Sequence, residues 1–266
     1  MDTVEFLQSK RNPSRSSSSE GDILKAATDA DSLAVGDQCL VSPASVRIPD
    51  MFSSIMSVEP LINSHYDKIK SEADAWAAMV YNLDDKVAKR NCEADFAYMN
   101  AIWAPHADEE AFRMMIDWHH WVFAFDDQFD EGHLRDDPVL ALEEISATIN
   151  IMTDDHPPIL KRENPIRYIF QTTWKRLQKV TTTEQQQRWI KNHKDYFTGL
   201  LRQVEIKKTK KRLTIDEYID FRRQSIGAMP SCSLIEYACD IKISQSVLDH
   251  PSVVECEKIS ADLVFL

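Results

Sequence analysis

Four acidic residues lie within six positions near the middle of this chain: Asp126, Asp127, Asp130 and Glu131. Carboxylates one helical turn apart repel each other, and at the C-terminal end of a helix they also oppose the helix dipole. Bound divalent cations offset both penalties. Oxygen-rich sites suit Mg²⁺, which keeps several waters and shares its coordination shell with substrate phosphates. The cluster therefore predicts a magnesium site that is shared with substrate phosphates.

The segment that leads into this cluster, residues 108–131, has the periodicity of a long helix. Its apolar residues recur at three- and four-residue steps and share one face: Phe112, Met115, Ile116, His119 and Phe123. The same three- and four-residue step continues to the aspartates. The apolar face of the helix therefore ends in paired carboxylates at its C-terminal end. The alternative interpretation is an acidic, solvated helix end before a turn at Gly132, which the apolar face disfavours. A calcium loop fits poorly, because its glycine falls one position late.

Composition favours helices over sheets. Only five glycines occur among the 266 residues. Tight hairpins and glycine-rich phosphate loops need glycine, so sheet-rich and nucleotide-binding folds are disfavoured. Acidic residues outnumber basic ones by 43 to 31, and the net charge of −12 argues against nucleic-acid binding. A protein with this charge needs metal ions to hold a polyphosphate.

The cysteine pattern and the length of the apolar runs indicate the cellular compartment of the protein. The five cysteines include no Cys-x-x-Cys pair, which favours reduced structural thiols over a disulfide framework or a zinc site. No apolar run reaches the roughly 18 residues of a membrane span, and the N-terminal residues have no apolar signal core. These features predict a cytoplasmic protein with no membrane span.

Helical periodicity extends over most of the chain after residue 48, and no strand alternation competes with it. The pattern predicts one all-α domain over residues 48–266. Its expected helices lie near 60–91, 93–103, 108–131, 138–153, 165–179, 184–206, 215–229, 231–243 and 251–266.

Several of these helices have start signals. Thr181 with Glu184 and Thr214 with Glu217 have the spacing of a capping box, and prolines suit the first turns at 138 and 165. Residues 1–47 have no sustained periodicity, so we expect a flexible extension, with a phosphorylated or targeting tail as the alternative. The basic run 207–212 is interpreted as a solvated loop, with a phosphate-attracting lid as the alternative.

The acidic segment resembles the aspartate-rich motif of the class I terpene synthases, specifically the fungal and bacterial sesquiterpene cyclases. The similarity lies in Trp118–His133, which reads WHHWVFAFDDQFDEGH and has the aromatic lead-in usual in that family. Ile48–Phe52 is similar to the entry to the catalytic domain, and Asn100–His106 to the approach to the motif helix. The resemblance extends from about residue 47 to the end of the sequence.

The resemblance implies a helical bundle around a deep apolar cavity. Three Mg²⁺ ions, with Mn²⁺ as a substitute, and basic side chains would hold a prenyl diphosphate at its mouth, and farnesyl diphosphate is the favoured substrate. Asp126 and Asp130 would be the metal ligands, with Asp127 and Glu131 as further candidates, and Phe123 would line the cavity. A homodimer is a candidate assembly.

A second element, Tyr218–Gly227, resembles the family's diphosphate-sensing helix, where an arginine precedes a small residue at a helix break. Arg223 fits best as the catalytic sensor, because Gly227 follows it by one turn, and Arg222 is the alternative. Both arginines and Gly227 are therefore candidate substrate-binding residues. Surface charges on an amphipathic helix would explain the same residues without a function.

The family's second metal motif, with Asn, Ser and Glu at four-residue steps, is expected just past residue 266, because Ser260–Leu266 resembles the run before it. We therefore expect a C-terminally incomplete bundle that does not turn over prenyl diphosphate. A chain-elongating prenyltransferase is disfavoured, because paired arginines do not follow the acidic motif. A catalytically dead fragment that serves as a helical binding module is the rival from another class.

Overall fold

The computed structural model describes residues 50–265 except 55 and 154. The described residues fall into two compact units, one within residues 50–60 and the other over residues 61–265. In the first unit, the described residues form turns and bends, such as the hydrogen bond from Ser54 N to Met51 O at 3.1 Å. The predicted flexible extension over residues 1–47 lies outside the described residues.

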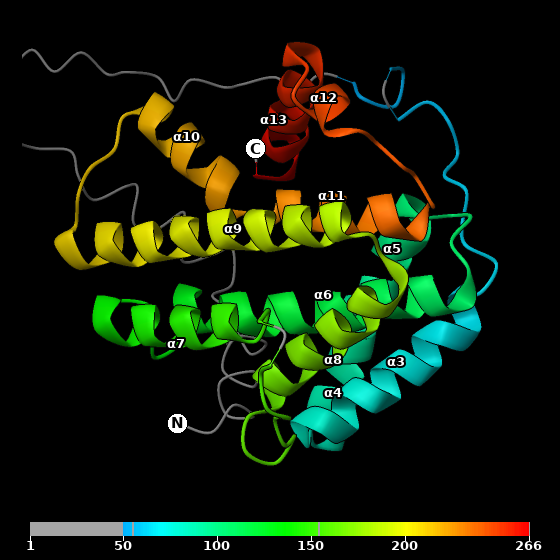
Figure 1. Ribbon diagram of the computed structural model, residues 1–266, viewed down its shortest axis with the longest axis horizontal. Coiled ribbons are helices and arrows are strands. Elements are labelled where there is room, and N and C mark those ends of the chain that lie inside the picture. The colour runs from blue at the N-terminus through cyan, green and yellow to red at the C-terminus, as the bar shows by residue number, and fades with distance from the viewer. Residues whose placement is uncertain (1–49, 55, 154, 266) are drawn as a thin grey trace, which may run out of the picture. The chain divides into compact units, whose positions relative to one another are not determined.

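The larger unit confirms the all-α prediction, because its described residues form helices and no strand. No described helix is long and apolar enough to span a membrane. The helices (Figure 1) are α3 (Tyr66–Tyr81), α4 (Asp85–Ala94), α5 (Phe96–Trp103), α6 (Glu109–Asp130), α7 (Pro138–Asn150), α8 (Pro165–Val180), α9 (Thr183–Thr209), α10 (Ile215–Ser225), α11 (Ala228–Ala238), α12 (Gln245–Leu248) and α13 (Pro251–Phe265).

Helix α6, the predicted 108–131 helix, lies at the centre of the core. Asp108 caps its start by accepting a hydrogen bond from Ala111 N at 2.8 Å. Helices α3, α5, α8, α9 and α11 all contact α6, so most of its residues are buried rather than one face alone. The core is rich in aromatic rings, with the indoles of Trp118, Trp121 and Trp189 inaccessible to solvent.

Helix α9 runs alongside α6 and α7 and also contacts α10 and α11 (Figure 1). Gly199 allows the close approach to α10. A Cβ built at Gly199 would lie 2.7 Å from the backbone carbon of Gln224 and 2.7 Å from the nitrogen of Ser225. Any side chain at this position would push the two helices apart, so glycine fixes the distance between α9 and α10.

Several predicted helix boundaries are wrong, among them that of the expected helix 231–243, which ends at Ala238. The expected helix 60–91 is two helices, because Asn82 adopts the left-handed conformation with φ 51° after α3, and Asp84 caps α4. The expected helix 215–229 ends at Ser225, and Gly227 with φ 75° separates α10 from α11. Asparagine and glycine are the residues that adopt positive φ most readily, so each break has a local cause.

One predicted capping box is displaced by one residue. Thr181 is the C-cap of α8, and its hydroxyl donates to Leu177 O at 2.7 Å. Thr182 is therefore the residue that caps α9, reciprocally with Gln185. The box at Thr214, with Glu217, is confirmed, as are the prolines in the first turns of α7 and α8.

Candidate metal and diphosphate site

Two of the four clustered acids face α9. The hydroxyl of Tyr196 donates to Asp126 Oδ1 at 3.0 Å, and the side-chain amide of Gln203 donates to Asp130 Oδ1 at 2.6 Å. Both aspartates are half-buried, whereas Tyr196 and Gln203 are buried. The carboxylates one turn apart on α6 therefore meet hydrogen-bond donors two turns apart on one face of α9.

The buried tyrosine responds to these carboxylates. Burial raises the pKa of Tyr196 well above its ordinary value, and the negative charge of Asp126 raises it further. Tyr196 is therefore a neutral hydroxyl across the physiological pH range. It acts toward Asp126 only as a hydrogen-bond donor.

Lys207 provides a cation at the C-terminal end of α6. Its ammonium group donates to the backbone oxygen of Asp130 at 2.8 Å and lies 3.6 Å from the Asp130 carboxylate. A cation at this position interacts favourably with the partial negative charge at the C-terminal end of the helix. The prediction of a loop at 207–212 is wrong at its start, because α9 continues through Thr209.

The other two acids of the cluster lie elsewhere. Burial raises the pKa of Tyr81 at the end of α3, and the negative charge of Asp127 raises it further. Glu131 is exposed and is the C-cap of α6. The sequence motif of four acids is thus divided between different surroundings.

An open hollow of about 610 Å³ lies beside Asp130. Its charged lining residues are Asp130, Lys207, Lys211 and Arg222, and its apolar lining includes Ile206 and Phe221. Cations therefore outnumber carboxylates in this hollow, although the chain as a whole is acidic. The charge balance favours an anionic ligand.

The two adjacent arginines have different partners. Arg222 lines the hollow, and its Nη1 lies 3.4 Å from Gln203 Oε1 and 3.3 Å from Ser225 Oγ. Within the described residues, Arg222 pairs with no carboxylate, and its buried Nε has no hydrogen-bond partner. Arg223 instead forms two hydrogen bonds of 2.7 Å with the Asp262 carboxylate on α13. The structure thus brings Arg222, rather than Arg223, beside Asp130.

Two further candidates lie apart from the charged lining. Phe123 is not among the residues that line the hollow. Its side chain is 41% exposed, and its ring stacks on Phe96 of α5 with the ring centroids 4.4 Å apart. Gly227 lies at the α10–α11 break, and a Cβ built there would be 3.7 Å from the Tyr196 ring.

The donor set fits a magnesium ion that is completed by substrate. Among the described residues, no group of three or more His, Cys, Asp or Glu side chains is arranged to hold a metal ion. Asp126 and Asp130 supply carboxylate oxygens on the same face, and Mg²⁺ is commonly held by one or two carboxylates together with water and phosphate oxygens. These two aspartates suit such an ion, which would bind with the anion.

Sequence reasoning missed Tyr196 and Gln203. Their seven-residue spacing places them on one helix face, as the spacing of Asp126 and Asp130 does on α6. A polar pair at that spacing in a buried helix was the available signal. It does not by itself identify which helix the pair faces.

Residues 117–266 match the family described as terpene synthase family 2, C-terminal metal binding. The chain is 43% identical over 227 residues to a (+)-eremophilene synthase of Gibberella fujikuroi, covering 84% of this chain and 63% of that protein. It is 40% identical to an inactive (1R,4R,5S)-(-)-guaia-6,10(14)-diene synthase of the same species, covering 82% and 58%.

A solved structure gives the same fold. The crystal structure of a-eudesmol synthase superposes with a TM-score of 0.67 at 19% identity, covering 82% of this chain and 70% of that one. The chain spans about three fifths of the length of the curated relatives it matches. Because the family match covers more than half of the chain, including the whole acidic cluster, the chain belongs to terpene synthase family 2.

Proposed function

We propose that this chain carries the first metal-binding motif, the aspartate-rich one, of a class I terpene cyclase. Such an enzyme ionises and cyclises a prenyl diphosphate with release of diphosphate. The observation that supports this most strongly is that half-buried Asp130 and Arg222 line the same hollow, while among the described residues no ion pair joins Arg222 to a carboxylate. A carboxylate and an arginine that line one hollow suit a metal ion and an anionic group bound together.

Different residues of the site would bind the metal ion and the anion. Asp126 and Asp130 would hold Mg²⁺, which neutralises charge that develops on the departing diphosphate. Arg222 and Lys207 would donate hydrogen bonds to phosphate oxygens. The planar guanidinium of Arg222 can donate two parallel hydrogen bonds to one phosphate group. Both contacts become stronger as the leaving group gains charge, so they favour ionisation of the substrate.

Farnesyl diphosphate is the substrate we favour, because the acidic motif resembles that of the sesquiterpene cyclases. We further infer that the 266-residue polypeptide binds substrate without turning it over. No asparagine follows Arg223 in its sequence, so an Asn-Ser-Glu metal motif after that arginine is absent from these residues. A helical binding module without catalysis is the second candidate, and the absence of that motif from these residues favours it.

One titration tests the anion contacts. With farnesyl diphosphate and excess Mg²⁺, followed by tryptophan fluorescence, we expect Arg222→Gln to bind about 10- to 100-fold more weakly than the unmodified chain. This range corresponds to the roughly 1.5–3 kcal/mol of a hydrogen bond to a charged group. Arg223→Gln is the matched control and should bind as the unmodified chain does, because Asp262 already occupies its guanidinium.

Two outcomes would contradict this assignment. Normal binding by Arg222→Gln together with weak binding by Arg223→Gln would make Arg223 the diphosphate contact, with Asp262 displaced by substrate. A cyclic hydrocarbon in the same incubations, detected by gas chromatography, would overturn the inference that this polypeptide does not turn over its substrate.

A further inference from the structure

Helix α9 connects the two halves of the candidate site. On one side, Tyr196 and Gln203 donate hydrogen bonds to Asp126 at 3.0 Å and to Asp130 at 2.6 Å. On the other side, the same two residues contact the α10–α11 region. Resting on the function proposed above, we infer that Tyr196 and Gln203 are positioning residues that orient the metal-binding carboxylates and tie them to the diphosphate-binding elements.

Gln203 is the more direct of the two connections. Its amide nitrogen donates to Asp130 Oδ1, and its amide oxygen lies 3.4 Å from Nη1 of Arg222. One side chain therefore contacts both a candidate metal ligand and a candidate anion ligand. Gln203 is buried, so its amide has a fixed orientation in which donor and acceptor face different partners.

Tyr196 connects Asp126 to the helix break. Its hydroxyl donates to Asp126 Oδ1, and its ring lies 3.7 Å from the position that a Cβ would take at Gly227. Gly227 has φ 75° and is the N-cap of α11, so the ring packs against the point between the end of α10 and the start of α11. A change at this break would therefore reach Asp126 through one rigid side chain.

The spacing along α9 makes the arrangement possible. Gly199 lies between the two residues and allows α10 to approach α9 at backbone distance. A larger residue there would separate Gln203 from Arg222. The close packing of α9 on α10 is thus the structural reason that one glutamine can contact both sides of the site.

The physical role of such residues is well defined. A metal-binding carboxylate that accepts a hydrogen bond through one oxygen is held in one rotamer, which lowers the cost of presenting its other oxygen to the metal. Loss of a partner of this kind typically weakens metal binding by about 10- to 100-fold. The anion should be affected less, because its own contacts remain.

The experiment measures two affinities in Tyr196→Phe and Gln203→Met. Calorimetric titrations vary Mg²⁺ at fixed inorganic diphosphate, and then diphosphate at saturating Mg²⁺. We expect the Mg²⁺ midpoint to rise about tenfold or more in each variant, while diphosphate binding at saturating Mg²⁺ stays within about threefold of the unmodified chain. A general structural defect would weaken both.

Tyr66→Phe is the matched control. It removes a hydroxyl that donates to a carboxylate, Asp95, at 2.6 Å, on α3 and away from the hollow. Its Mg²⁺ midpoint should equal that of the unmodified chain. Unchanged midpoints in both Tyr196→Phe and Gln203→Met, with Mg²⁺-dependent binding intact in the unmodified chain, would overturn this inference alone. Absence of such binding in the unmodified chain would instead overturn the proposed function.

Thermal unfolding of each variant separates a loss of binding from a loss of folding. Tyr196→Phe keeps the buried ring and should unfold within a few degrees of the unmodified chain. If Gln203→Met unfolds early, Tyr196→Phe still decides the question, because its expected Mg²⁺ midpoint is the same.

Discussion

The free energy of unfolding should fall by roughly 4 kcal/mol when the pH is lowered from 6.5 to 4.5, because two buried histidines must stay neutral in the folded protein. Burial lowers the pKa of His193 from 6.5 to about 3 and that of His119 from 6.5 to about 4. Between these values the unfolded chain binds more protons than the folded chain. Stability is therefore complete above pH 6.5 and is lost as the pH falls.

The surroundings of His193 explain why protonation is unfavourable. Its Nδ1 lies 2.8 Å from Trp189 O, and its Nε2 accepts a hydrogen bond from the indole nitrogen of Trp118 at 3.1 Å. The neutral ring with its proton on Nδ1 satisfies both partners. A second proton on Nε2 would face the indole N–H, so the charged form loses this hydrogen bond as well as its hydration.

Denaturant unfolding, followed by circular dichroism at several pH values between 7 and 4.5, measures this loss. His193→Gln should be less stable at pH 7 but should have a shallower pH dependence, by about 1.4 kcal/mol per pH unit. His106→Gln, at an exposed position, should leave the slope unchanged. A His193→Gln slope equal to that of the unmodified chain would show that His193 does not cause the acid sensitivity.

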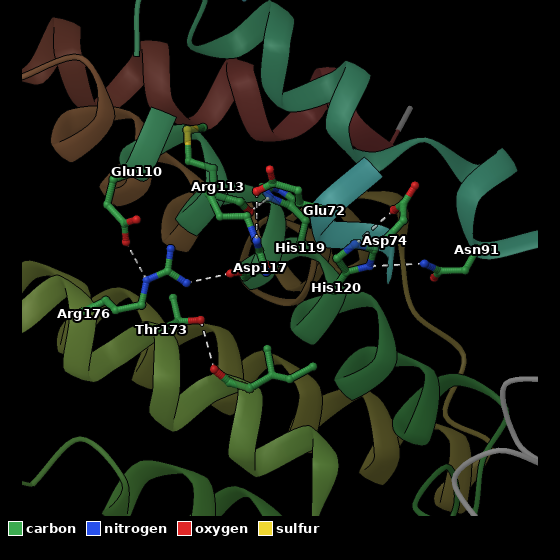
Figure 2. A network of polar contacts seen from close by, with 12 residues as sticks. Glu72, Asp74, Asn91, Glu110, Arg113, Asp117, His119, His120, Thr173 and Arg176 are labelled. Atoms are coloured by element: carbon green, nitrogen blue, oxygen red, sulfur yellow. Dashed lines mark hydrogen bonds and ion pairs between the residues drawn. The ribbon is translucent and has the colours of Figure 1, made fainter. Parts of the chain in front are cut away.

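Replacing Asp117 by Asn should cost about 3–5 kcal/mol of unfolding free energy, as the loss of one partner from a buried ion pair does. Asp117 is 1% exposed on α6. Its two carboxylate oxygens bind Arg113 at 2.8 Å and Arg176 of α8 at 2.6 Å, and Arg176 also binds Glu110 at 2.9 Å (Figure 2). The substitution leaves two guanidinium groups against a neutral amide in the contact between α6 and α8.

Glu110→Gln is the matched control for Asp117→Asn. Glu110 contacts the same Arg176, but its side chain is 68% exposed, so we expect a loss below about 1 kcal/mol. Chemical denaturation of both variants at pH 7 measures the difference. Equal small losses in the two variants would mean that water replaces the buried carboxylate at little cost, and that the network does not stabilise the α6–α8 contact.

Local features of this chain could be predicted from its sequence. The identity of α6 follows from the step that connects Phe112 to Asp126, and the capping of α10 follows from Thr214 and Glu217, because both patterns lie within a few turns of one helix. Thr181 and Thr182 both have the chemistry of an N-cap. The structure selects Thr182, since the hydroxyl of Thr181 is already bonded to the preceding helix.

The partners of the acidic residues could not be predicted in this way. Tyr196 is 70 residues from Asp126 in sequence, and their contact depends on how α9 packs beside α6. Similarly, Arg222 and Arg223 differ by about 100° around α10. Only the packing of α10 between α9 and α13 decides that one faces Asp130 and the other Asp262. Local chemistry identifies such residues, and tertiary packing assigns their partners.

The most direct test of the proposed site is calorimetry of inorganic diphosphate binding, with and without Mg²⁺. We predict binding that requires Mg²⁺, is lost in Asp126→Asn and Asp130→Asn, and is retained in Glu131→Gln, whose carboxylate lies exposed at the end of α6. Equal diphosphate affinity in Mg²⁺ and in a chelator, or no binding under either condition, would contradict the account. Either result would leave the acidic cluster as a solvated helix end.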